Sequence, residues 1–210
     1  MEKIRQTIKD HPWLRWVILI IAGFVVLANY YFYDALSAIK TRMQSELDLS
    51  STDYGLIVAF YSVPNTFLLM TIFGGLILDK WGIRLTGFIF ILFTTLGAFI
   101  TAYGASDIYS NQGFGYQFMG SFLPNYTPEL KMMMLGRLFY GLGAETSIVV
   151  ISKIIVKWFK GKELAFAFAS KIAIARIGTM PALIFSPIIV ETAAKWHTAI
   201  WLAAILVAIS

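Results

Sequence analysis

The sequence contains no cysteine and only two histidines among its 210 residues. Without thiols the chain cannot form disulfides, zinc–thiolate sites, iron–sulfur clusters or a thiol nucleophile. Charged residues are also scarce, because they make up 14% of this chain and about 25% of a typical soluble domain. Hydrophobic residues account for 58%. This composition excludes a soluble globular domain, a disordered chain and a disulfide scaffold, and it predicts a membrane protein.

Enzymatic motifs are missing as well. The two histidines, His11 and His197, both lie near the ends of apolar stretches. No zinc-protease helix motif, phosphate-binding loop or nucleophile elbow occurs in the chain. We therefore expect neither enzyme activity nor a bound metal or cofactor.

Five apolar stretches are long enough to cross a bilayer, which requires about 20 residues, and a sixth begins near the carboxyl terminus. They run over residues 13–38, 54–78, 83–103, 132–158, 163–190 and 196–210. The sixth stretch has 15 residues, or about 22 Å of helix, which is short of a full crossing. The sequence predicts an all-α membrane protein: residues 1–12 form a cytoplasmic segment, and residues 13–210 form a six-helix transmembrane bundle whose sixth helix is truncated.

Lysine and arginine are distributed unevenly between the predicted loops. Nine lie on the side of the amino terminus and four lie on the opposite side. Because basic loops stay inside, this asymmetry predicts a cytoplasmic amino terminus. It also explains the net charge of +5 as a topology signal, so we expect a lipid bilayer rather than nucleic acid as partner.

Two opposite charges fall deep inside the apolar stretches. A charge at the bilayer centre costs at least about 2.5 kcal/mol, so it usually faces a partner or a wet cavity. Glu145 lies about 18 Å, and Arg176 about 20 Å, from the cytoplasmic ends of their helices. We expect both near the midplane, facing a solute pathway. The alternative is a structural ion pair that joins the two helices.

Further polar residues accompany these charges. Arg137, Gly141 and Glu145 recur every four residues, so they share one helix face. The missing side chain of Gly141 allows another helix or a substrate to approach closely. Tyrosine and asparagine side chains in the first two stretches add hydrogen-bonding groups, which predicts a polar pocket. The predicted substrate-binding residues are Glu145, Arg176, Tyr30, Tyr61 and Asn65.

Three short motifs resemble those of major facilitator superfamily transporters. Residues 75–84, GLILDKWGIR, resemble the loop between helices two and three of that superfamily. Residues 137–144, RLFYGLGA, are similar to its helix-four motif, and residues 158–163, WFKGKE, resemble its segment before helix five. Together they indicate the amino-terminal six-helix half of such a transporter. The gating and structural residues that this resemblance implies are Gly75, Asp79, Lys80, Gly82, Arg84, Arg137 and Gly141.

Within the superfamily, residues 24–180 resemble the lysosomal dipeptide transporter group, for example in YSVPN at residues 61–65 and ARIG at residues 175–178. This resemblance implies that Glu145 holds the amino end of a dipeptide and Arg176 its carboxylate, which suits a guanidinium fork. It also implies a second six-helix half as partner, with the substrate at the interface between the halves. We expect half of an alternating-access transporter for a small zwitterionic solute such as a dipeptide. The alternatives are another organic solute, with the two charges as a gating pair, or a non-transporting six-helix interaction module.

Overall fold

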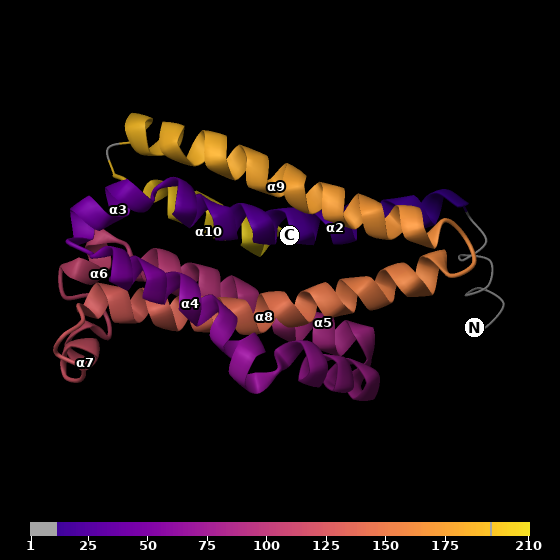
Figure 1. The fold of residues 1–210 in the computed structure, drawn as a ribbon, viewed down its shortest axis with the longest axis horizontal. Coiled ribbons are helices and arrows are strands. Elements are labelled where there is room, and N and C mark those ends of the chain that lie inside the picture. Colours follow the sequence, from indigo (N-terminus) through magenta and orange to yellow (C-terminus); the bar gives the residue numbers. More distant parts are fainter. Residues whose placement is uncertain (1–11, 194) are drawn as a thin grey trace.

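The computed structural model describes residues 12–193 and 195–210, which form helices and their connections (Figure 1). The predicted cytoplasmic segment therefore lies almost wholly outside the described residues. The helices are α2 (Pro12–Ala38), α3 (Lys40–Leu47), α4 (Ser51–Leu68), α5 (Met70–Gly104), α6 (Asp107–Ser110), α7 (Tyr116–Gly120), α8 (Pro128–Phe159), α9 (Leu164–Thr192) and α10 (Thr198–Ile209). Four of them, α2, α5, α8 and α9, are long and apolar enough to cross a membrane.

The long helices run back and forth between two ends of the bundle. The start of α2 and the connection from α8 to α9 lie at one end, which we call the proximal end (Figure 1). Helices α3, α6 and α7 lie at the opposite, distal end. The four long helices coincide with the predicted spans at residues 13–38, 83–103, 132–158 and 163–190.

The helices pack in two groups. Helices α4 and α5 pack against α8, whereas α2 packs mainly against α9, and α10 contacts both α2 and α5. Figure 1 shows α9 and α2 along one side of the molecule and α8 along the other. Buried aliphatic and aromatic residues fill the space between the groups, including Phe32, Leu36, Met133 and Ile200.

The second predicted span is broken in the middle. It was expected as one helix over residues 54–78, but α4 ends at Leu68 and α5 begins at Met70. Between them Leu69 adopts the left-handed conformation, with φ 48°. The side-chain oxygen of Asn65 accepts hydrogen bonds from the Thr71 hydroxyl, at 2.6 Å, and from the Thr71 amide, at 3.2 Å. Asn65 therefore stabilises the start of the second segment, and the prediction of a continuous helix is wrong here.

The second and third spans meet at Gly82 without a separate loop. This residue has φ 79° and ψ 170°, a combination that is essentially restricted to glycine. The chain changes direction sharply there, inside the segment assigned to α5. The predicted separation of the two spans at residues 79–82 agrees with this position.

Candidate functional site

A cavity of about 200 Å³ opens between α2, α4 and α8. Four of its lining residues are tyrosines, which offer both ring faces and hydroxyl groups to a ligand. Alanine, isoleucine and asparagine complete the wall. The lining residues are Asn29, Tyr30, Tyr33, Tyr61, Tyr140, Ala144 and Ile148. Tyr30 and Tyr61 were predicted as site residues, and both line this cavity.

Glu145 is half-buried on α8 and is held by α4. The hydroxyl of Tyr61 donates a hydrogen bond to the Glu145 carboxylate over 2.9 Å. Helix α4 can come this close because Gly141 has no side chain: a Cβ atom there would lie 2.0 Å from the Tyr61 carbonyl oxygen. Gly141 thus accommodates a neighbouring helix, which was one of the two roles considered from the sequence.

Arg176 occupies a different environment on α9. Its side chain is exposed, and its guanidinium carbon lies 5.9 Å from the ring centroid of Tyr30. Among residues 12–193 and 195–210, no salt bridge joins Arg176 to Glu145, so the helix-joining ion pair does not form in this structure. Neither Glu145 nor Arg176 is among the residues that line the cavity, but each contacts a tyrosine that does.

Arg137 is buried against three of the four tyrosines that line the cavity. It is only 1% exposed, and its guanidinium carbon lies 4.9, 5.4 and 5.5 Å from the ring centroids of Tyr33, Tyr61 and Tyr140. A cation over an aromatic face is attracted by the ring quadrupole, by up to about 2 kcal/mol when water is excluded. Arg137 therefore holds together three of the rings that shape the cavity.

Other predicted residues lie away from the cavity. Asn65 is engaged by Thr71 at the helix break and is not among the residues that line the cavity. Asp79 forms an ion pair with Lys153 of α8, which ties the turn at Gly82 to the fourth span. The remaining motif residues Gly75, Lys80 and Arg84 lie along the same proximal part of α5, and the two cations are exposed.

Tyr140 also belongs to the candidate site, although no sequence pattern singles it out. Its ring lines the cavity, and its buried hydroxyl donates a hydrogen bond to the carbonyl oxygen of Asn29 over 2.6 Å. The available signal was its position three residues after Arg137, which places the two on neighbouring turns of one helix face.

The sequence model of the Major Facilitator Superfamily matches residues 16–210. The chain belongs to this superfamily. It is therefore an all-α integral membrane protein of a transporter family, and its apolar helices are the expected membrane spans.

Individual relatives fall into two groups. The "Lysosomal dipeptide transporter MFSD1" of Danio rerio is 32% identical over 171 residues, covering 81% of this chain and 32% of that protein. The protein of the same name from Homo sapiens is 30% identical over 79% of this chain and 31% of its own length. The "Probable galactarate/D-glucarate transporter GarP" of Escherichia coli K12 is 30% identical over 74% of this chain and 31% of that protein.

These matches are partial with respect to the relatives. The chain spans about a third of the length of the curated relatives it matches. No solved structure matches this chain significantly.

Proposed function

We propose that this chain is the amino-terminal half of a transporter that moves a small zwitterionic solute, a dipeptide in particular, across a membrane by alternating access. The proposal depends on one observation: two opposite charges each contact a tyrosine that lines the same cavity. Glu145 accepts a hydrogen bond from Tyr61, Arg176 lies against Tyr30, and both tyrosines line one cavity.

The proposed recognition uses opposite charges at the two ends of the ligand. The Glu145 carboxylate accepts hydrogen bonds from the ammonium group, and the Arg176 guanidinium binds the carboxylate with two parallel N–H donors. The tyrosine rings between them contact the backbone and the first side chain of the peptide. The exposure of Arg176 leaves this side chain able to turn towards a ligand.

The two kinds of relative differ in the charge of the solute that their names state. A dipeptide has one positive and one negative end, whereas galactarate is a dicarboxylate. A second negative group next to Glu145 would be repelled, since like charges a few ångströms apart interact unfavourably. An acid and a base that each contact a tyrosine of the cavity wall therefore favour the zwitterion.

We propose the same orientation and partner as the sequence indicates. Residues 1–12 and the proximal end face the cytoplasm, and a second six-helix half covers the cavity. In this arrangement the exposed Arg176 faces the interface between the halves, and the Asp79–Lys153 ion pair belongs to the cytoplasmic gate.

Thermal stabilisation in detergent of the complete transporter, with both halves, tests the proposal, because a ligand that binds the folded state raises the unfolding temperature. We expect stabilisation by a dipeptide with free ends, and less by an N-acetylated or a C-amidated dipeptide, each of which lacks one charge. Glu145→Gln should abolish the difference between the free and the acetylated peptide. Arg176→Gln should abolish the difference between the free and the amidated peptide.

Matched controls are available at charges outside the cavity. Glu191→Gln and Arg42→Gln remove one acid and one base from the distal end and should leave all ligand differences intact. Equal stabilisation by all three peptides, or a preference for galactarate over dipeptides, would contradict the proposal.

A further inference from the structure

The connection between α5 and α8 carries no charge over residues 108–128, between Asp107 and Glu129. It is also rich in aromatic residues, and several of them point away from the protein. Phe114 is 92% exposed and Phe118 is 69% exposed. Exposure of such side chains to water is unfavourable by about 25 cal/mol for each Å² of apolar surface. These side chains are therefore more stable in contact with an apolar environment.

The connection at residues 105–127, which we call the platform, holds these phenylalanines in place. Tyr109 is fully buried and packs with Met119 and Met132 against the ends of α5 and α8. The Tyr103 hydroxyl donates a hydrogen bond to the Phe114 carbonyl oxygen over 3.4 Å. At the other end of the connection, the Lys131 ammonium donates to the Phe122 carbonyl oxygen over 2.6 Å and lies 4.9 Å from that ring. The connection is therefore anchored on both sides.

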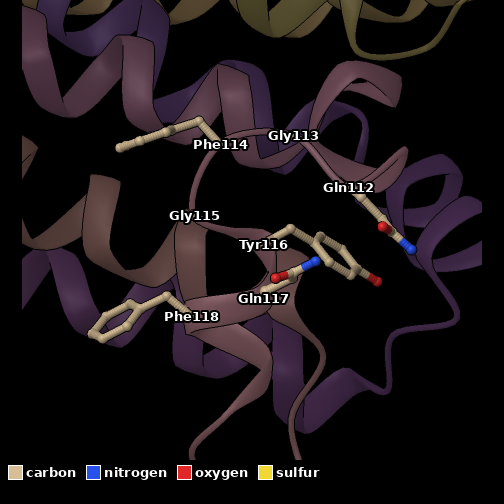
Figure 2. Close-up of a pocket in the computed structure, with 7 residues that line it drawn as sticks. All are labelled: Gln112, Gly113, Phe114, Gly115, Tyr116, Gln117 and Phe118. Carbon is tan, nitrogen blue, oxygen red and sulfur yellow. The ribbon is translucent and has the colours of Figure 1, made fainter.

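Apolar and polar groups separate on this platform. Figure 2 shows Phe114 and Phe118 extending to one side and Gln112 and Tyr116 lying on the other, and all four residues line a hollow of about 440 Å³. Phe118 and Phe122 also contact each other edge to face, with ring centroids 5.7 Å apart. One face of the connection is thus a phenylalanine patch, formed by Phe114, Phe118 and Phe122.

The patch continues a stripe on the outside of α5. Leu85, Phe88, Leu92 and Leu96 are all exposed and recur at the spacing of one helix face. Ile100 and Tyr103 follow at the same spacing, and both pack against the buried core of the platform. In a membrane protein such an exposed apolar stripe faces lipid, so the platform lies where that lipid surface reaches the distal end of α5.

We infer that the phenylalanine patch inserts into the interfacial region of the lipid leaflet at the distal end, and so anchors the connection to the membrane. Phenylalanine, tryptophan and leucine form the apolar faces of segments that lie in this interface, where these faces are buried about 5–10 Å into the boundary between headgroups and acyl chains. The lack of charge over residues 108–128 means that the attachment depends on apolar burial rather than on anionic lipids. The inference does not depend on which solute the cavity binds.

The cysteine-free sequence allows a direct test with single spin labels in phosphatidylcholine vesicles. Labels on Phe114→Cys and Phe118→Cys report collisions with oxygen, which enters lipid, and with a nickel chelate, which stays in water. Leu92→Cys on the apolar stripe is the lipid reference, and Thr41→Cys on exposed α3 is the water reference. Gln117→Cys, beside Phe118 on α7, is the matched comparison within the platform.

We expect the ratio of oxygen to nickel collisions at Phe114 and Phe118 to lie nearer to that of Leu92 than to that of Thr41, and above that of Gln117. The ratio should not change when phosphatidylglycerol replaces part of the phosphatidylcholine. Ratios like that of Thr41 would show that the patch faces water. Immobile labels that neither reagent reaches would show contact with protein, and a requirement for phosphatidylglycerol would show attachment by charge. Each of these three results would overturn the inference.

Discussion

The acidic and the basic end of the candidate site are built differently. Glu145 is half-buried on α8, which both α4 and α5 cover, and it accepts a hydrogen bond from Tyr61. Arg176 is exposed on α9, and its described contact is the ring of Tyr30 on α2. One end is therefore fixed by the fold, whereas the other is presented on the surface of the bundle.

This difference separates stability from recognition. Substitutions around the acidic end disturb packed helices, so they are expected to cost both folding free energy and binding. Substitutions at the basic end remove few contacts, so they are expected to affect binding with little loss of stability. The predictions below test this separation, beginning with the largest expected effect.

Gly141→Ala is the most disruptive change at the acidic end. The new Cβ atom would lie 2.0 Å from the Tyr61 carbonyl oxygen, so α4 must move away from α8. We expect a loss of about 3 kcal/mol in unfolding free energy, at the upper end of overpacking effects, seen as a lower thermal midpoint in detergent. Gly55→Ala is the control, because nothing lies within 4 Å of that position. Equal midpoints for the two variants would show that α4 does not fix this end.

Arg137→Ala compares a buried arginine with an exposed one. Removal of the guanidinium loses its contacts with three tyrosine rings, and we expect a loss of about 2 kcal/mol in unfolding free energy. The matched variant is Arg176→Ala, which should leave the thermal midpoint unchanged because that side chain is exposed. If both variants lower the midpoint equally, the proposed separation between the two ends is wrong.

Tyr61→Phe removes a single hydroxyl from the acidic end. We expect a loss of about 1 kcal/mol, because a hydrogen bond to a half-buried carboxylate contributes modestly to stability. Tyr33→Phe is the control: its ring packs edge to face on Tyr61 at 4.8 Å, and its hydroxyl makes no side-chain hydrogen bond within residues 12–193 and 195–210. Thermal midpoints of the two variants measure the difference, and a larger loss for Tyr33→Phe would contradict the assignment.

Much of this architecture could be predicted from the sequence. Hydropathy gives the spans because the bilayer imposes a minimum length on each apolar helix. The depth of Glu145 and Arg176 follows from counting residues along two helices, and both charges do contact the lining of one cavity. The close approach at Gly141 follows from the four-residue spacing that places it on the face of Glu145.

The remaining features depend on tertiary contacts that no local pattern reveals. Leucine rarely adopts the left-handed conformation, so the break at Leu69 was not expected. Asn65 is predicted as a pocket residue, but at the break its side chain accepts a hydrogen bond from Thr71. The burial of Arg137 among three tyrosines joins residues from α2, α4 and α8, and only the packed bundle brings these together.

A solvated ion pair at the distal end gives the smallest expected effect. Asp107 accepts a hydrogen bond from Lys195 and lies 3.5 Å from His197. The hydrogen bond from Lys195, together with the charge of His197, lowers the pKa of the Asp107 carboxyl. Because the folded-state pKa is depressed, the resulting stability is present above the unfolded-state value of about 3.9. It is lost as the pH falls through the folded-state pKa.

Asp107→Asn should therefore lower the thermal midpoint slightly at neutral pH and have no effect in strong acid. The carboxylate is about half exposed, so we expect less than about 1 kcal/mol, and less still in high salt. Glu191→Gln, at an exposed distal acid, should show no such pH-dependent difference. A loss as large as that of Tyr61→Phe would mean that water screens the distal pair less than its exposure indicates. In that case, burial would not explain why the acidic end of the site contributes more to stability than an exposed ion pair.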